Sequence, residues 1–544
     1  MRILRFLIAF LPLLIAIIVL YIFYEPPIIV PVDYPTIQEA VDAALPGDWI
    51  FVKKGVYNEQ VVIDSTKNNI KIIATDKDVV LEGTGVGNAF TLNQVVNVKI
   101  QGFNINNYGN GIYFDHANGC FSKKNKLTNH DIAGVFIEGG SDNKIVKNKF
   151  SSSDIGIISV ISNNNYITKN GITNTLAGIL IEESQNVKIS SNKIMNNSEG
   201  IVSSGISSEI VRNHIADNNG IGIELIVSNS DKIIKNKILN NAEQGILISS
   251  GTLNPVIMSN KIKYNNGGIE FEGTPPDAGN NNPLIEKNII SKNRNDGIKT
   301  ATNSSFIYKN KITKNCGNGI NAPEVLEANA ISNNKIANNR LNGIFINQGN
   351  DNIINNNYIK KNRLNGIQIG SSTSSNIITL NKVYKNGING MLLDSTDAIL
   401  IRNTSSKNAD AGIVINGNNT LLNSNTTLKN GTDGIQINNN ICQVTSNRSS
   451  KNKNNGIVIN RNNNIADNNI TKKNKIDGIL VVGNNNVISE NNSLKNHEVG
   501  IRVNGDNNLI DNNTALNNKA FDLEDNGTGN IFIDNIFETG NNIP

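Results

Sequence analysis

The chain has 544 residues, of which about a fifth are Asn, 46 are Gly and 12 are Pro, and its net charge is +4. Asn favours tight turns, and the helix formers Ala, Leu, Glu and Gln are sparse after residue 50, so the composition excludes an ordinary helical or globular domain. Lys is spread over most turns, without the clustered Arg and Lys and interleaved aromatic rings of a nucleic-acid stripe. We therefore expect no nucleic-acid partner.

The first 24 residues are typical of a membrane-spanning signal anchor. Arg2 and Arg5 precede an apolar run, residues 6–24, that is long enough as a helix to cross a hydrocarbon core of about 30 Å. The basic flank is expected to stay in the cytoplasm, which places the bulk of the chain outside the cell or in the periplasm. No small-x-small motif or lipobox cysteine follows the run, so a retained anchor is favoured over a cleaved signal peptide. Residues 25–32 are predicted to form a short, stiff spacer.

Residues 33–110 are predicted to contain a capping helix and the irregular first coils of a solenoid. Thr36 to Glu39 has the pattern of a helix capping box, and Pro46-Gly47 ends the helix before a strand. Because an open solenoid must cover its first strand edges, we expect the helix to lie over the first coil. The apolar face that would pack there comprises Ile37, Ala40, Val41 and Ala44.

A Gly followed by Ile or another apolar residue recurs at intervals of 22 to 24 residues, with one longer interval of 29 between Gly268 and Gly297. This period predicts about eighteen regular coils over residues 111–519. The glycines are Gly111, Gly134, Gly156, Gly178, Gly200, Gly222, Gly245, Gly268, Gly297, Gly319, Gly343, Gly366, Gly390, Gly412, Gly434, Gly456, Gly478 and Gly500.

Each repeat contains three short strands, as the unit from Gly178 to Asn197 shows. Ile179 and Ile181 alternate in the first strand, Val187 and Ile189 in the second, and Ile194 marks the third. Strands this short are stable only when coils stack, so the pattern predicts an all-β, right-handed parallel β-helix with three sheets. Leucine-rich repeats are excluded because Ile and Val dominate, and left-handed β-helices because a six-residue period is absent.

One Asn precedes the third strand of every repeat, from Asn125 and Asn148 to Asn513. A tight corner leaves backbone groups unpaired, and a stacked column of amide side chains can bond them. We therefore predict a structural Asn ladder. Cys120, Cys316 and Cys442 lie far apart and are expected to be free structural thiols.

Residues 520–544 are predicted to cap the other end of the solenoid. The large apolar residues expected to close the last coil are Phe521, Leu523, Ile531, Phe532 and Phe537.

The segment from Tyr34 to Ile63 resembles the opening of pectin-lyase-like β-helix proteins, and the coils resemble their parallel β-helix (PbH1) repeats. The tail from Asp522 to Phe537 resembles the NosD-like group, which belongs with carbohydrate-binding and sugar hydrolase (CASH) domains and is named for a factor in copper-enzyme maturation. The resemblance implies sugar bound on the outer face of the Gly-Ile strands. The superfamily that the chain resembles also includes lyases, epimerases and proteins without catalysis, so the resemblance does not predict a single activity.

The outward positions of the first coils supply one candidate site. Tyr113 and Phe136 would stack on sugar rings, and Asp115 and Glu138 would lie one coil apart, splitting their pKa values or sharing Ca²⁺. Tyr113 to His116 resembles the Y-G-x-D-P-H signature of alginate epimerases, but the Pro is missing. Asp115, His116 and Glu138 are therefore the candidate catalytic residues.

Further carboxylates occupy outward positions in later coils, and we predict that they bind a ligand: Glu182, Glu224, Glu270 and Glu272. Glu270 and Glu272 share one strand, near the carboxylate spacing of an inverting glycosidase. The insertion at residues 274–283 is expected to overhang them. The remaining charged side chains are read as a solvated surface.

A copper site is not expected, because His116, His130, His214 and His497 are scattered and Met195, Met258 and Met391 are isolated. The first hypothesis is a membrane-anchored, monomeric surface protein without a cofactor, which binds polysaccharide or another envelope glycan or acts as an envelope spacer. The second is a uronate epimerase or polysaccharide lyase acting near Asp115 and Glu138. The third is a NosD-like copper-enzyme assembly factor.

Overall fold

The computed structural model describes residues 26–272, 282–325 and 327–543. The chain divides into two compact units, Met1–Lys193 (unit 1) and Ile194–Pro544 (unit 2), which are described one at a time. The predicted signal anchor and most of the insertion at 274–283 lie outside the described residues. Within the described ranges, no helix is both long and apolar enough to cross a membrane.

Unit 1 begins with the strand β1 (Ile28–Val30), which pairs in parallel with β2 (Trp49–Val52). The prediction that residues 25–32 form a spacer is therefore wrong for Ile28–Val30, whose alternating apolar side chains complete a sheet edge. The capping helix is confirmed as α2 (Ile37–Ala43), where Thr36 Oγ1 accepts the amide of Glu39 at 3.1 Å. Ile37, Ala40 and Val41 are buried against the first coil.

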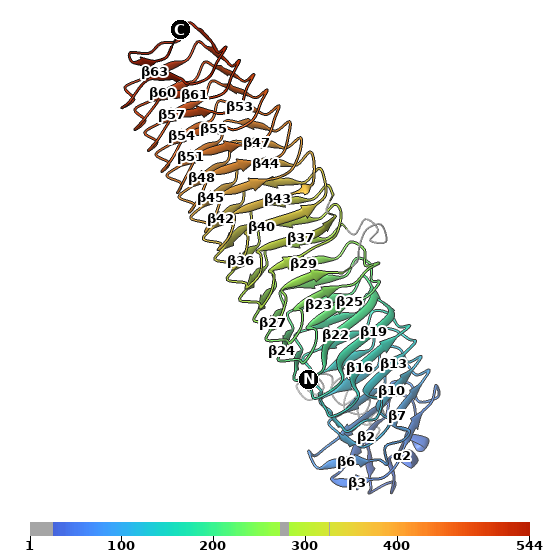
Figure 1. The fold of residues 1–544 in the computed structure, drawn as a ribbon. Helices are drawn as coiled ribbons and strands as arrows, with labels where there is room; N and C mark the ends of the chain where they lie inside the picture. Colours follow the sequence, from blue (N-terminus) through green and yellow to red (C-terminus); the bar gives the residue numbers. More distant parts are fainter. Residues whose placement is uncertain (1–25, 273–281, 326, 544) are drawn as a thin grey trace, which may run out of the picture. The chain divides into compact units, whose positions relative to one another are not determined.

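Each coil contributes one strand to each of three parallel sheets, and the first sheet contains the Gly-Ile strands (Figure 1). Coils before Gly111 already use these sheets, so the first coils are more regular than the sequence predicts. In unit 1 the strands of the first sheet are β4 (Val61–Ile63), β7 (Asn88–Asn93), β10 (Asn110–Asp115), β13 (Ala133–Glu138), β16 (Ile155–Val160) and β19 (Ala177–Gln185).

The second and third sheets of unit 1 consist of strands of three or four residues. The second sheet runs from β1 and β2 to β20 (Lys188–Ser190), and the third from β3 (Gly55–Tyr57) to β18 (Gly171–Thr173). Residues one repeat apart are direct neighbours, as in Ile112 beside Val135.

Unit 2 repeats this arrangement. Its second sheet runs from β23 (Glu209–Val211) to β65 (Ile531–Ile533) and its third from β24 (His214–Ala216) to β63 (Thr514–Leu516). The first sheet of unit 2 comprises β22 (Glu199–Ile206), β25 (Ile223–Leu225), β28 (Ile246–Ile248), β31 (Ile269–Phe271), β34 (Ile298–Lys299), β37 (Ile320–Val325), β40 (Ile344–Gln348), β43 (Ile367–Ser372), β46 (Met391–Leu393), β49 (Ile413–Ile415), β52 (Ile435–Ile437), β55 (Ile457–Ile459), β58 (Ile479–Val481), β61 (Ile501–Val503), β64 (Leu523–Asp525) and β66 (Gly540–Asn541).

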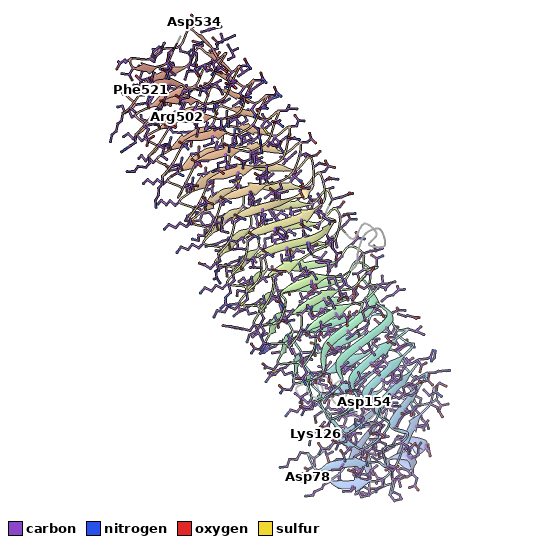
Figure 2. The ribbon with its side chains drawn as sticks, in the orientation of Figure 1. Asp78, Lys126, Asp154, Arg502, Phe521 and Asp534 are labelled. Atoms are coloured by element: carbon purple, nitrogen blue, oxygen red, sulfur yellow. The ribbon has the colours of Figure 1, made fainter. Side chains whose placement is uncertain are left out.

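The interior of each unit is a stack of aliphatic side chains. Ile435, Ile457 and Ile479 are register partners in successive coils, and all three are fully buried. Alternate side chains project outward from the coils (Figure 2). The interior is therefore continuous along the stack, and each coil is stabilised mainly by its two neighbours.

The predicted Asn ladder is confirmed at the corner between the second and third strands, which we call the second corner. Asn334 donates its backbone N–H to Asn357 Oδ1 at 2.9 Å, and its Nδ2 bonds both Asn357 Oδ1 and the Ile307 carbonyl. A further ladder, which the sequence analysis did not predict, lies at the third corner, between the third strand and the next coil. There Asn362 donates its backbone N–H to Asn386 Oδ1 at 3.1 Å.

The first corner, between the first and second strands, also carries stacked polar residues, and in unit 2 Asp231 replaces the usual Asn. Its Oδ1 accepts the backbone N–H of Ser208 at 2.7 Å, as Asn329 Oδ1 accepts that of Ser305. Burial raises the pKa of Asp231 to about 7. The carboxyl is thus held partly protonated at a position that an uncharged amide fills elsewhere.

Asp231→Asn is expected to stabilise the protein above about pH 7 by up to about 4 kcal/mol, because the amide cannot ionise. Because the folded-state pKa of Asp231 lies above the unfolded value of about 3.9, its protonated carboxyl contributes fully to stability below about pH 4. This contribution is lost as the pH rises toward 7. Denaturant midpoints measured near pH 4 and pH 8 check this. Equal pH dependence in both proteins would contradict the prediction.

The C-terminal coil is only partly closed. Leu523 is buried as predicted, whereas Ile531 and Phe537, which were expected to cover the last coil, are 57% and 38% exposed. Phe521 lies at the edge of the last coils (Figure 2). The prediction of a full apolar cap is therefore wrong for Ile531, in β65, and for Phe537, between β65 and β66, because no further coil follows to cover them.

Candidate functional site

A polar pocket of about 520 Å³ lies on the outer face of the first sheet of unit 2. It spans β31, β34 and β37 and the third corners beside them. Its polar lining includes Gln244, Glu270, Asp296, Lys299, Cys316 and Asn321, and Pro323 and Leu341 add apolar surface.

Glu270 and Lys299 occupy neighbouring outward positions because their strands are in parallel register. Lys299 Nζ lies 2.7 Å from Glu270 Oε1, and Gln244 Nε2 donates to Glu270 Oε2 at 2.8 Å. Glu270 holds the pKa of Lys299 above its ordinary value through this hydrogen bond. Lys299 is therefore held charged beside Glu270 in the lining of the pocket.

Asp296 lies beside this pair, and two donors hold it. It accepts the backbone N–H of Asn318 at 2.5 Å and Asn321 Nδ2 at 2.6 Å. Burial raises its pKa, and these hydrogen bonds oppose the shift. The Oδ1 of Asn321 is buried and accepts no hydrogen bond. Asn321 thus fixes the position of the Asp296 carboxylate in the lining of the pocket.

The predicted carboxylates of unit 2 divide between two places. Glu270 lines the pocket, whereas Glu272 is exposed beyond the end of β31 and does not line it. Glu224 is separated from Glu270 by Leu247 in the register, and its Oε1 accepts Ser249 Oγ at 3.3 Å. Burial raises the pKa of Glu224. The three glutamates therefore do not form one site.

The candidate catalytic residues of unit 1 form two separate pairs. Asp115 and Glu138 are register partners, but the Tyr113 hydroxyl donates to Glu138, and His116 Nδ1 lies 2.7 Å from Asp115 Oδ1. Burial is the main cause that raises the pKa of Tyr113, so its hydroxyl stays protonated. His116 stands just beyond the end of β10 in the left-handed region, with φ of +51°.

The aromatic pair of unit 1 lies on the same outer face. The rings of Tyr113 and Phe136 are 5.4 Å apart at an angle of 59°. Glu182 is exposed and separated from Glu138 by Val160 in the register. The first coils therefore bring together Tyr113, Phe136 and Glu138 but leave Glu182 alone. The Ca²⁺ site at Asp115 and Glu138 stays a prediction.

Two known protein families match parts of this chain. The family described as "Right handed beta helix region" matches residues 202–305, 277–416 and 374–494, which together span more than half of the chain. The chain belongs to the right-handed β-helix family. This confirms the predicted fold class and its handedness. The family described as "Periplasmic copper-binding protein (NosD)" matches residues 41–244, which confirms the NosD-like resemblance.

Solved structures similar to this right-handed β-helix protein are remote. An alginate lyase of family PL6, AlyGC, is 11% identical over 94% of this chain and 99% of its own, with a TM-score of 0.38. DFA-IIIase from Arthrobacter chlorophenolicus A6 is 12% identical over 66% of this chain and 92% of its own, with a TM-score of 0.32. The periplasmic alginate epimerase AlgG is 13% identical over 73% of this chain and 82% of its own, with a TM-score of 0.21. TM-scores this low carry no argument about activity. No curated protein matches the sequence.

The donor set described for this right-handed β-helix protein does not fit a copper centre. Copper prefers imidazole, thiolate and thioether ligands. Across the ranges that the structure describes, no three His, Cys, Asp or Glu side chains are grouped to hold a metal ion. His130 is buried, which lowers its pKa to about 4, and Cys120 is buried with its pKa raised to about 11. Both are packed within the coils of unit 1.

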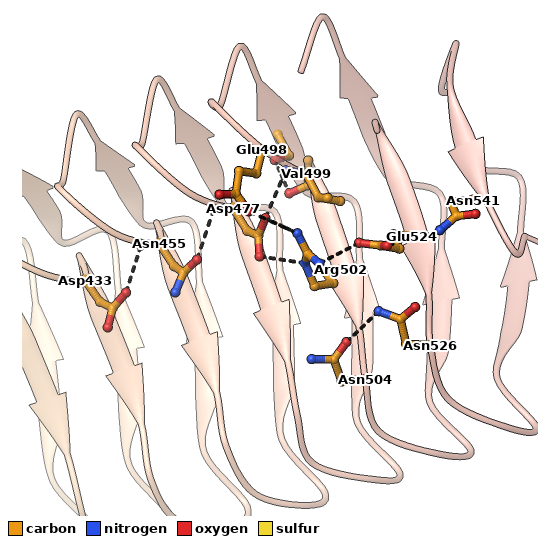
Figure 3. A network of polar contacts seen from close by, with 12 residues as sticks. Asp433, Asn455, Asp477, Glu498, Val499, Arg502, Asn504, Glu524, Asn526 and Asn541 are labelled. Atoms are coloured by element: carbon orange, nitrogen blue, oxygen red, sulfur yellow. Dashed lines mark hydrogen bonds and ion pairs between the residues drawn. The ribbon is translucent and has the colours of Figure 1, made fainter. Parts of the chain in front are cut away.

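Sequence reasoning missed two groups of polar residues. Asp296 and Asn321 were not predicted, although Asp296 stands directly before the coil-start Gly297. Arg502 was also missed; in β61 it faces Asp477, Glu498 and Glu524 at 2.9, 3.3 and 2.8 Å (Figure 3). Burial raises the pKa of Asp477, and Arg502 opposes this shift. The Arg502 network is structural, since each charged group in it is paired.

Proposed function

We propose that this right-handed β-helix protein binds a hydroxyl-rich polysaccharide in the pocket around Asn321 on the outer face of unit 2. The observation that carries the proposal is the polar lining of the pocket, where Asn321 holds the Asp296 carboxylate and Glu270 holds the Lys299 ammonium group. Sugar hydroxyls both donate to carboxylates and accept from amides and ammonium groups.

An aromatic platform adjoins the pocket. Phe345 is the register neighbour of Asn321 in β40, and its side chain is half-buried on the outer face. An exposed ring of this kind packs against the apolar face of a sugar. Two carboxylates and one ammonium line the pocket, which favours a neutral sugar over an anionic one.

Asn321→Ala is expected to weaken oligosaccharide binding by about tenfold, because the Asp296 carboxylate in the pocket loses the amide that holds it in place. Isothermal titration calorimetry with the full chain and a panel of neutral oligosaccharides, in the presence of Ca²⁺ or a chelator, measures the change. Gln436→Ala is the control, since Gln436 is an amide on the same face of β52 outside the pocket. Failure of every neutral glycan to bind the wild-type chain would overturn the proposal.

The location proposed for this activity is the outer side of the cytoplasmic membrane. The match to a family described as periplasmic supports a bulk outside the cytoplasm. The apolar run at residues 6–24 supports anchoring in the membrane. Membrane fractionation of cells producing the full chain, compared with a chain that lacks residues 1–24, checks the anchor.

A second candidate is acid–base chemistry on a uronate polymer in unit 1. It is favoured by the His116–Asp115 contact of 2.7 Å, which orients the imidazole, and by the Tyr113 hydroxyl, which is held on the same face by its hydrogen bond to Glu138. Incubation of the chain with alginate, pectin and glycosaminoglycans, with no new double bond or epimer formed, would exclude it. The copper-assembly hypothesis is supported by the match to the family described as a periplasmic copper-binding protein, but the donor set of the described residues does not fit a copper centre.

A further inference from the structure

Seven consecutive coils of unit 2 carry Lys at the same position of the third corner. Each of these residues directly precedes the Asn of the third-corner ladder. Its backbone N–H donates to the carbonyl of the residue before the next Lys, as Lys407 does to Leu428 at 3.0 Å and Lys429 to Ser450 at 3.1 Å. The seven residues therefore form one column, the lysine ridge: Lys361, Lys385, Lys407, Lys429, Lys451, Lys473 and Lys495.

The backbone of the corner does not explain the choice of Lys. All seven residues have φ between +53° and +57°, a region in which Asn and Gly are favoured. The first and second corners of the same coils also contain one residue with positive φ each, and none of these is Lys. They are Asp351, Ser375, Asp397, Asn419, Ile441, Asn463 and Asn485 at the first corner, and Asn356, Leu380, Arg402, Ser424, Ser446, Asn468 and Glu490 at the second. The ammonium group itself is therefore the feature that recurs.

The ammonium groups of the lysine ridge are exposed, and none is part of an ion pair among residues 327–543. The carboxylates of the same corner have other partners. Asp410 accepts Thr432 Oγ1, Asp433 accepts Gln436 Nε2, and both Asp477 and Glu498 contact Arg502 (Figure 3). Since none of these carboxylates forms an ion pair with a lysine of the ridge, the seven ammonium groups are open to an external anion.

Further cations widen the ridge. Two residues after the Lys position, the exposed side chains include Arg363, Lys453 and Lys475, and Lys519 follows in the next coil. Lys519, followed by burial and Lys475, lowers the pKa of His497, which shows that the positive charges act on one another here. Coils lie about 4.8 Å apart, less than the Debye length of about 8 Å at physiological salt, so adjacent charges add to one field.

We propose that the lysine ridge binds a linear acidic polysaccharide, one carboxylate to about one coil. A uronate polymer is extended and carries one carboxylate per sugar, which matches a straight column of single ammonium groups. Tyr384 adjoins Lys385 at one end of the ridge, but residues 401–500 contain no Phe, Tyr or Trp, so the ridge from Lys407 to Lys495 lacks the stacking platform of a single-stranded nucleic-acid site. This surface is separate from the Asn321 pocket and does not depend on the function proposed there.

The test compares two variants of the full chain that lose the same charge. The ridge variant combines Lys407→Gln, Lys429→Gln, Lys451→Gln and Lys473→Gln. The control combines Lys77→Gln, Lys149→Gln, Lys237→Gln and Lys335→Gln, which are exposed residues outside the ridge. At low salt the ridge variant is expected to bind polygalacturonate at least about tenfold more weakly than the control, and the difference should vanish near 1 M salt.

Three outcomes would overturn the proposal. An unchanged ridge variant places the binding elsewhere, and an equal loss in the control shows a diffuse effect of net charge. Tighter ridge-dependent binding to duplex DNA or to phosphatidylglycerol vesicles than to polygalacturonate makes the partner a phosphate polymer or a membrane. Circular dichroism checks that both variants fold. Asn321→Ala should keep polygalacturonate binding, so the pocket and the ridge can fail separately.

Discussion

Substituting alanine for Gly343 is expected to destabilise unit 2 by more than about 4 kcal/mol or to prevent its folding. A Cβ at this coil-start glycine would lie 2.5 Å from the Gly366 carbonyl oxygen, 2.5 Å from Ile359 Cγ2 and 2.8 Å from Asn362 Nδ2. The carbonyl cannot move freely, because it accepts the Ile344 N–H at 3.0 Å. Relief of the clash would separate two coils and break their ladder contacts, which is more costly than ordinary overpacking.

Guanidinium unfolding followed by far-UV circular dichroism measures the effect. Gly171→Ala is the control, since a Cβ there meets no atom within 4 Å and the backbone has no positive φ. That change should be neutral or slightly stabilising, by up to about 1 kcal/mol. Similar small effects at Gly343 and Gly171 would show that close packing of successive coils does not select glycine at the coil start.

This close packing is the reason why the fold could be predicted from the sequence. The Gly at each coil start and the Asn at each second corner are imposed by contacts between successive coils, so they recur with the period of the coil. Ile and Val at alternate positions then identify the interior. The spacing between glycines alone gives the register of the first sheet, as the pairing of Ile435 with Ile457 confirms.

The pocket and the lysine ridge could not be predicted in the same way. Asp296 and Cys316 reach the pocket from third corners, and a repeat pattern does not tell toward which sheet a corner side chain leans. The sequence analysis treated the lysines as scattered over a solvated surface. Their alignment becomes apparent only in the structure, where they form a column of left-handed residues beside the Asn ladder of the third corner. Ile28–Val30 was read as a spacer because two prolines precede it and one follows, although it forms the edge strand β1.

Substituting alanine for Asn357 is expected to destabilise unit 2 by about 3 kcal/mol. The Oδ1 of Asn357 accepts the backbone N–H of Asn334 at 2.9 Å, and its Nδ2 donates to the Ile331 carbonyl at 2.8 Å. Both backbone groups would stay buried without a partner, at a cost of roughly 1–3 kcal/mol each. Water cannot replace the amide without opening the stack, since Asn357 is 1% exposed.

Asn355→Ala is the matched control two residues earlier in the same coil. Asn355 is at the end of β41 (Ile353–Asn355), and its Oδ1 makes no hydrogen bond, so its loss should change stability by less than about 0.5 kcal/mol. Denaturant midpoints compare the two variants, and hydrogen exchange should show lost protection of the Asn334 amide in Asn357→Ala alone. Because coils are stabilised by their neighbours, the loss of protection should spread to adjacent coils before distant ones. Equal destabilisation by both variants would mean that Asn357 contributes through its volume and not through the ladder.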